Sequence, residues 1–267
     1  MPSAERRASR RRHLHVVQNV FFAALRIVLR HAHGFYTALG IVLIAGAVLS
    51  VAATWGFSEL AELVREGSTQ EFDEAVLHWI GERRSPTADR VMLELTLLGS
   101  GIVVMMIVAV AGLFLWLTDH RFSALLLLAA TWGGVAMNQL LKARFDRPRP
   151  QIFEWGTHAL TSSFPSGHAM AATIIYGTVA YLAARLQRRH LTRWITLTVA
   201  GILIVLICLS RLYLGVHYPS DLIAGVVMGV AWSAFCMATL EAMRVFGRRF
   251  RPAILEHEQP PPDDSDA

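Results

Sequence analysis

The chain has 267 residues, of which 54% are hydrophobic and only 17% are charged, and its mean hydropathy is +0.43. A water-soluble domain of this length carries more charge on its surface, so the composition excludes a soluble protein and predicts an integral membrane protein. The net charge of +5 does not indicate nucleic-acid binding, because the arginines gather in short blocks that flank apolar segments.

Both ends of the chain are predicted to lie in the cytoplasm, outside a membrane domain at residues 34–243. Residues 1–33 are basic and contain an amphipathic stretch at 14–30, which predicts an interfacial helix on an anionic leaflet. Residues 244–267 end in prolines and acidic side chains, a composition typical of a disordered tail.

Six apolar runs lie between these ends, each near the roughly 20 residues that cross about 30 Å of hydrocarbon. Basic residues cluster beside the first run, between the second and third, between the fourth and fifth, and after the sixth, which places these segments in the cytoplasm. We therefore expect an all-α polytopic protein with six transmembrane helices and both termini inside. The runs cover residues 34–55, 91–117, 122–141, 167–184, 194–212 and 221–243.

The first long connection, residues 56–90, is then extracytoplasmic. It carries eight acidic residues against four arginines, the opposite charge bias from the cytoplasmic segments. Ser68 and Glu71 have the spacing of a capping box, and an apolar stripe that includes Phe72 and Trp79 follows them. These features favour a helix packed over the span ends rather than a lid over a substrate.

Cations crowd into the next external segment, at the end of the third span. Lys142, Arg144, Arg147 and Arg149 fall within eight positions, and Lys142 is the only lysine in the chain. Lysine and arginine are not equivalent donors to an oxyanion, so a lysine at this position indicates a task beyond anchoring at the membrane boundary.

The fourth span begins with Pro165, Ser166, Gly167 and His168. Serine is a good N-cap, and glycine lets a ligand approach the backbone closely. Free N–H groups and a partial positive charge at a helix N-terminus attract an anion. The pattern therefore predicts an anion site, with His168 facing the anion.

A third polar cluster lies between the fifth and sixth spans. Arg211 ends one apolar run, His217 follows in a short gap, and Asp221 comes one helical turn later, behind Pro219. This spacing lets a carboxylate orient an imidazole, which can then act as a base or nucleophile. Taken alone, a His–Asp pair that caps a helix is an equal alternative.

Together these three stretches resemble the three-part signature of the type 2 phosphatidic acid phosphatase (PAP2) family. Lys142 is followed after six residues by Arg149 and Pro150; then come Pro165-Ser166-Gly167-His168, and Ser210-Arg211 with His217 and Asp221. Every signature position matches. The family includes bacterial membrane lipid phosphatases, among them undecaprenyl-diphosphate phosphatases, and soluble vanadium haloperoxidases, so the resemblance implies a helical core of that type.

The resemblance implies a role for each signature residue. Lys142, Arg149 and Arg211 would hold a phosphoryl group together with the Ser166 hydroxyl and the Gly167 N–H. His217, oriented by Asp221, would attack phosphorus; His168 would protonate the leaving oxygen and then activate water. His217 must be neutral for this task, and His168 protonated.

No cofactor and no metal are expected. Cys208 and Cys236 lie inside apolar runs, no carboxylate cluster lies near the predicted site, and the cations already neutralise charge there. The expected partners are the membrane and a lipid phosphate substrate, with no nucleic acid; the sequence leaves the oligomeric state open.

The predicted function is a metal-independent lipid phosphatase of the bacterial cytoplasmic membrane, acting at the outer face. Undecaprenyl diphosphate is the first candidate substrate, followed by phosphatidate and phosphatidylglycerophosphate. A lipid phosphotransferase would use the same residues with an acceptor other than water, and a lipid carrier could keep the fold without catalysis. Six spans argue against a haloperoxidase.

Overall fold

The computed structural model describes residues 35–157 and 161–249. In these residues the chain forms helices and no strand, which confirms the predicted all-α class. The predicted interfacial helix at 14–30 and the tail beyond Arg249 lie outside the described residues. The described helices are α2 (Phe35–Arg65), α3 (Gln70–Gly81), α4 (Pro86–Leu97), α5 (Gly101–Leu117), α6 (Arg121–Phe145), α7 (Gly167–Leu186), α8 (His190–Tyr213) and α9 (Pro219–Arg249).

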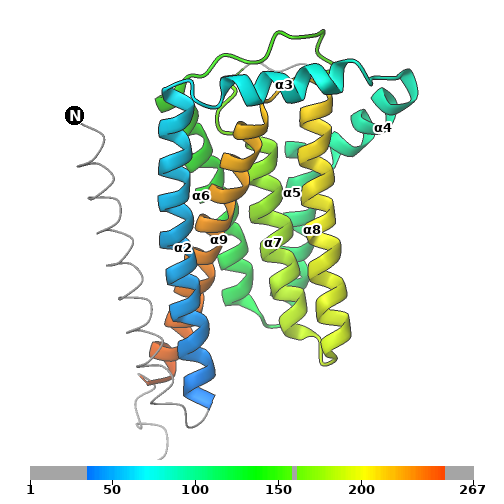
Figure 1. Cartoon of the computed structure of the whole chain (residues 1–267). Helices are drawn as coiled ribbons and strands as arrows, with labels where there is room; N and C mark the ends of the chain where they lie inside the picture. Colours follow the sequence, from blue (N-terminus) through cyan, green and yellow to red (C-terminus); the bar gives the residue numbers. More distant parts are fainter. Residues whose placement is uncertain (1–34, 158–160, 250–267) are drawn as a thin grey trace, which may run out of the picture. The chain divides into compact units, whose positions relative to one another are not determined.

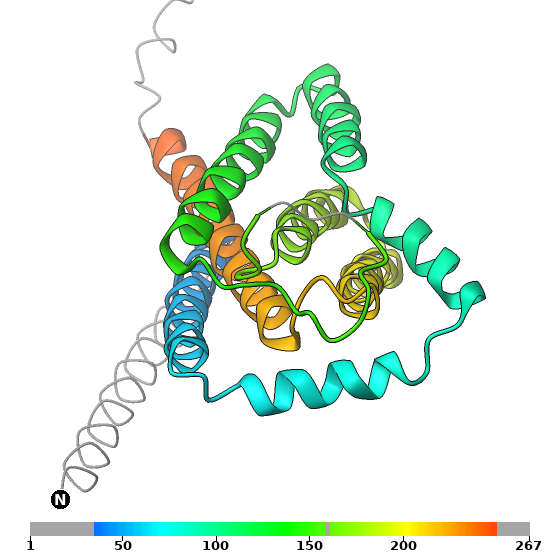
Figure 2. The ribbon, with the colours of Figure 1, turned by 90° about the horizontal axis from the view of Figure 1, so that it is seen from above.

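The chain divides into two compact units, and residues 44–240 form the unit that holds the predicted site. Within this unit the long helices lie side by side, while α3 lies across one end of them (Figure 1). Seen from that end, α3 runs along one side from α2 to α4, and α7 and α8 lie inside the ring of the other helices (Figure 2).

Five helices of the described segments are long and apolar enough to cross a membrane, and a bent pair, α4 with α5, makes a sixth if it counts as one span. Many large apolar side chains on these helices are exposed, including Val110, Leu113 and Leu117 of α5. Side chains of this kind face lipid in a membrane protein, so the exposed faces agree with a multi-pass arrangement.

The second predicted span is not one straight helix. It bends by 41° between α4 and α5, at Leu98, Gly99 and Ser100. Ser100 caps α5 by accepting a hydrogen bond from the Val103 N–H, and Tyr176 donates to the free Leu98 carbonyl at 2.8 Å. The break is thus held by side chains, and it brings the end of α4 toward α7.

The connection at 56–90 is helical, as expected, but its details differ from the prediction. Helix α2 continues to Arg65, and Thr69 rather than Ser68 precedes α3, with no side-chain cap. The predicted apolar stripe is largely on the outer face, because Phe72 and Trp79 are exposed while Asp73, Leu77 and Ile80 are buried.

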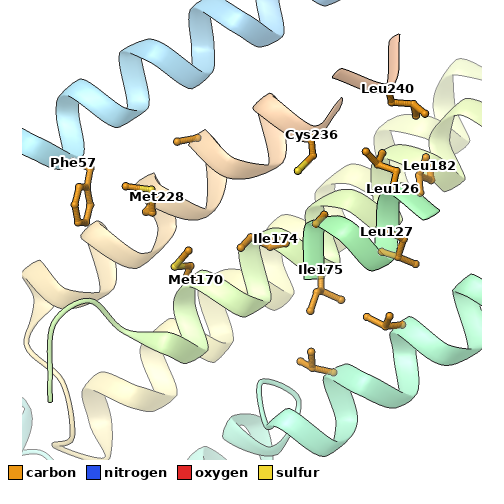
Figure 3. Close-up of a cluster of buried hydrophobic side chains, with 14 of the residues drawn as sticks. Phe57, Leu126, Leu127, Met170, Ile174, Ile175, Leu182, Met228, Cys236 and Leu240 are labelled. Atoms are coloured by element: carbon orange, nitrogen blue, oxygen red, sulfur yellow. The ribbon is translucent and has the colours of Figure 1, made fainter. Parts of the chain in front are cut away.

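One hydrophobic cluster joins the long helices of the 44–240 unit. Met170, Ile174 and Ile175 of α7 lie between Leu127 of α6 and Met228 of α9 (Figure 3). Burying this apolar surface against protein fixes α7 in the middle of the unit. The start of α7 is therefore held at a defined position relative to α6 and α9.

Candidate active site

Four helix ends meet at the end of the unit where α3 lies. Helices α6 and α8 end there, and their successors α7 and α9 begin there, because each successive pair is antiparallel (Figure 1). All the predicted site residues belong to these four ends or to the turns between them: Lys142, Arg149, Ser166, Gly167, His168, Arg211, His217 and Asp221.

Lys142 and Arg149 are held by the short segment that precedes α7. Lys142 Nζ donates to Thr161 Oγ1 and to the Ser162 carbonyl, both at 2.8 Å. Arg149 Nε donates to the Thr161 carbonyl at 2.8 Å. Because both cations bind Thr161, they lie side by side, and the Lys142 ammonium is held at the end of α6.

Arg211 approaches the same place from the end of α8. Its side chain is buried, and Nη1 donates to Thr96 Oγ1 at 2.9 Å. Its Nε is buried and has no hydrogen-bond partner among the described residues. A buried guanidinium N–H without a partner is costly, so this donor is poised for an anionic ligand.

His217 is buried in the turn between α8 and α9. Burial lowers the pKa of His217 to about 4, helped by Arg149 and Arg211 and opposed by the hydrogen bond and charge of Asp221. The imidazole is therefore neutral at neutral pH. Its Nε2 lies 3.3 Å from Arg149 Nη1, so its lone pair faces the cations.

Asp221 lies behind His217, in the first turn of α9. Its Oδ2 is 3.5 Å from His217 Nδ1 and accepts hydrogen bonds from the Tyr218 N–H at 2.9 Å and from the Ser163 hydroxyl. The bond from Tyr218 is the backbone half of a capping box. Asp221 therefore caps α9 and orients the imidazole with the same oxygen.

Helix α7 presents its N-terminus to this cluster. Ser166 caps it, accepting from the Ala169 N–H at 3.5 Å, and the Ser166 N–H donates to the Asp221 carbonyl at 3.0 Å. The next N–H groups, of Gly167 and His168, have no intrahelical partner because they belong to the first turn. His168 lies within Coulombic range of Arg211, His217, Lys142 and Arg149.

Two glycines allow close contacts between the segments that carry the site residues. A Cβ on Gly225 would lie 2.6 Å from the Ser166 carbonyl, so α9 can pack against the start of α7 only with glycine there. Gly215 has φ +73°, and a Cβ on it would lie 2.4 Å from Phe153. This glycine lets the turn that carries His217 reverse tightly.

The structure brings all eight predicted site residues to one place, and it adds residues that the sequence patterns did not single out. Thr96 binds Arg211, while Thr161, Ser162 and Ser163 bind Lys142, Arg149 and Asp221. The run of three hydroxyl residues directly before Phe164 and Pro165 was a signal for the second group. For Thr96 the signal was the short stretch Thr96-Leu97-Leu98-Gly99-Ser100, which weakly resembles membrane members of the PAP2 family. Within the described segments, no group of three His, Cys, Asp or Glu side chains could hold a metal ion.

The profile of the PAP2 superfamily matches residues 123–245. Phosphatidylglycerophosphatase B of Bacillus subtilis is 30% identical over 175 residues, which are 65% of this chain and 86% of that protein. The chain belongs to the PAP2 superfamily. The crystal structure of a transmembrane PAP2 type phosphatidylglycerolphosphate phosphatase from Bacillus subtilis has a TM-score of 0.66 and 26% identity, covering 76% of this chain and 98% of that chain.

A further relative of this PAP2 protein, an undecaprenyl-diphosphatase of Sulfolobus acidocaldarius, is 36% identical over 81 residues, 30% of this chain and 34% of that protein. The relatives are lipid phosphatases, so the predicted family and enzyme class, a membrane lipid phosphatase, are confirmed. The predicted roles of the individual residues and the choice of lipid remain predictions.

Proposed function

We propose that this PAP2 protein removes phosphate from a membrane lipid phosphate or diphosphate through a phosphohistidine intermediate on His217. The observation that carries the proposal is the environment of the buried imidazole. Its Nε2 faces Arg149 at 3.3 Å, its Nδ1 faces Asp221, and its pKa of about 4, lowered by burial, keeps it neutral. A neutral imidazole beside several cations is suited to attack a phosphoryl group that those cations hold.

The reaction then has two steps. In the first, the Nε2 lone pair forms a bond to phosphorus, the bond from phosphorus to the leaving oxygen breaks, and His168 gives a proton to that oxygen. In the second, His168 takes a proton from water, the water oxygen forms a bond to phosphorus, and the bond from phosphorus to His217 Nε2 breaks, which releases inorganic phosphate and restores the neutral imidazole. Lys142, Arg149 and Arg211 stabilise the charge on the phosphoryl oxygens in both steps.

A cavity of about 240 Å³ next to His168 supports a lipid substrate. Gly167 and His168 line one part of it, and apolar residues of α5, α6 and α7, such as Val104 and Ile174, line another. Met105 and Val135, also in the lining, are exposed on helices that cross the membrane. We infer that the headgroup lies at His168 and that the apolar chain leaves between these helices.

We infer that the site is extracytoplasmic and that both termini are cytoplasmic, from the basic segments beside the spans. For the lipid, the relatives' names give two candidates, phosphatidylglycerophosphate and undecaprenyl diphosphate. Phosphatidate remains the third. We also propose that hydrolysis requires no divalent metal, because three cationic side chains already surround the phosphate position.

The test is release of inorganic phosphate by the purified protein in detergent, from these three lipids, with and without chelator. We expect release from at least one lipid, unchanged by the chelator and lost in His217→Ala. Release that survives His217→Ala contradicts the proposed nucleophile, and loss in chelator with recovery on adding Mg²⁺ contradicts metal independence. Donor consumption only when an acceptor lipid is added would instead identify a phosphotransferase.

A further inference from the structure

Arg147, the third of the four cations in the 142–149 segment, does not join Arg149 at His217 Nε2. Its guanidinium lies behind Asp221 instead, where Nη1 donates to Asp221 Oδ1 at 2.7 Å and to Ser220 Oγ at 2.8 Å. The guanidinium carbon Cζ also lies over the Tyr218 ring, 4.2 Å from its centroid, within range of a cation–π interaction. Arg147 thus contacts Tyr218, Ser220 and Asp221 at the start of α9, and none of these residues belongs to the predicted phosphate-binding set.

The other half of the Arg147 fork binds helix α3. Nη2 donates to Asp73 Oδ2 at 2.9 Å and to Gln70 Oε1 at 3.1 Å. Asp73 also accepts from the Ser220 N–H at 3.0 Å and from the Ser220 hydroxyl. One helix that lies across the outer end of the unit is therefore tied to the catalytic turn through a carboxylate, a guanidinium and a second carboxylate.

This bridge is buried. The Asp73 and Asp221 side chains are 0% exposed and that of Arg147 is 10% exposed. Desolvating three charges is costly, and replacing such groups with apolar residues often stabilises a protein. A buried charged chain that connects an outer helix to a functional carboxylate is better explained by orientation than by stability.

The two carboxylate oxygens of Asp221 have different partners. Oδ1 is bound by Arg147, which leaves Oδ2 for Ser163, the Tyr218 N–H and the imidazole. If the carboxylate rotated, Oδ2 would leave the position from which it orients His217 Nδ1. Because the guanidinium is itself fixed by Asp73 and by its contact with the Tyr218 ring, this rotation is prevented.

We propose that Arg147 and Asp73 are positioning residues of the active site, through which α3 holds the Asp221 carboxylate in line with His217. The inference rests on the proposed role of His217 as nucleophile. Arg147 and Asp73 do not touch the phosphoryl group, so their loss reduces the rate of attack and leaves substrate binding in place.

The test compares kcat and KM of Arg147→Gln and Asp73→Asn with matched controls that remove the same charges nearby, Arg144→Gln and Glu71→Gln, both exposed. We expect kcat to fall about 10- to 100-fold in each test variant with KM changed by less than about threefold, since small displacements of reacting groups cost that much. The controls should match the unsubstituted enzyme. Because the two residues act in one chain, the double variant should have about the kcat of Arg147→Gln alone.

Folding is checked by the thermal transition in detergent. If Arg147→Gln does not fold, Asp73→Asn and Arg147→Lys test the inference. The amide of Asp73→Asn places a donor opposite Arg147 Nη2. The lysine of Arg147→Lys keeps the positive charge but cannot bridge both carboxylates. An unchanged kcat in folded Asp73→Asn, or a raised KM at unchanged kcat, overturns the inference. His217→Ala separates the two failures. If kcat is unchanged in Asp73→Asn and His217→Ala is inactive, only the positioning role of Arg147 and Asp73 is wrong. If His217→Ala also keeps its activity, the proposed nucleophile is wrong as well.

Discussion

The contact between Arg149 Nη1 and His217 Nε2 places a cation beside the imidazole that we propose as the nucleophile. The guanidinium lies 3.3 Å from Nε2, so in the proposed reaction a bound phosphoryl group has to replace this contact before the lone pair can reach phosphorus. Arg149 is itself held by the Val216 carbonyl at 2.6 Å, next to His217 in the chain. In the proposed reaction, this bond therefore positions Arg149 relative to the backbone next to His217.

The pH dependence of kcat/KM follows from this environment. His217 must be neutral to attack, so activity is lost as the pH falls through the pKa of His217, which burial lowers to about 4. We expect the acidic limb of kcat/KM to lie near pH 4, and to move to higher pH in Arg149→Gln, because removing a nearby cation raises the pKa of the imidazole. An acidic limb of kcat/KM near pH 6.5 that does not shift in Arg149→Gln would contradict the assignment of this limb to protonation of His217.

Thr96 gives a second prediction for a single residue. Its hydroxyl accepts from Arg211 Nη1, and both side chains are buried. In Thr96→Val the guanidinium loses this hydrogen bond, which costs about 1.5 to 3 kcal/mol for a bond to a charged donor. We expect KM to rise about tenfold or more with a smaller change in kcat, measured as initial rates of phosphate release. Thr192→Val, at the other end of α8, should change neither constant.

Among the helices that carry none of the eight predicted site residues, the broken pair α4 and α5 contacts the site through Thr96 and Gly99. The break supplies Thr96 to Arg211, and it places Gly99 against α7 and α8. A Cβ on Gly99 would lie 2.7 Å from Ile207 Cγ2 and 3.0 Å from the His168 ring. Only a residue without a side chain lets the break approach His168 this closely.

Gly99→Ala should therefore displace His168 and lower kcat about tenfold or more, while Gly101→Ala, whose added methyl meets no atom within 4 Å, should not. The comparison uses phosphate release and the thermal transition of both variants. Equal activity of the two alanine variants would show that the contact with His168 has no catalytic consequence.

The sequence predicted most elements because length and apolar content decide whether a helix can cross a membrane. It did not predict the 41° break, since Leu98, Gly99 and Ser100 lie inside an apolar run and the bend depends on contacts with Tyr176. It also misjudged the buried face of α3. Asp73 faces inward because Arg147, 74 residues away in the chain, neutralises it, and no local pattern contains that partner.

The site was easier to predict than the elements that support it. Lys142, His168 and His217 belong to motifs whose chemistry is visible in the residue types and their spacing. Arg147 lies within one of these motifs, and its position suggested a rim residue or a local ion pair, because the sequence does not tell which way a cation turns. The buried pairs that Arg147 makes with Asp73 and Asp221 needed the three-dimensional arrangement.

For the whole molecule, the orientation in the membrane decides which lipids the enzyme can reach. The inferred topology puts α3 and the site outside and the connection between α7 and α8 inside. In a variant without Cys208 and Cys236, we expect a membrane-impermeant maleimide to label Glu71→Cys in intact cells, and Arg188→Cys only after lysis. The reverse pattern would place the site in the cytoplasm.

The most direct test of the account is to detect phosphoryl transfer to His217. The purified enzyme is mixed with a lipid substrate radiolabelled in its terminal phosphate, quenched with alkali within the first turnover, and digested for phosphopeptide mapping. We predict an acid-labile, alkali-stable phosphoryl group on the peptide that contains His217 in the unsubstituted enzyme, and none on that peptide in His217→Ala. Turnover without a phosphoenzyme, or with the label on another residue, would contradict the central claim.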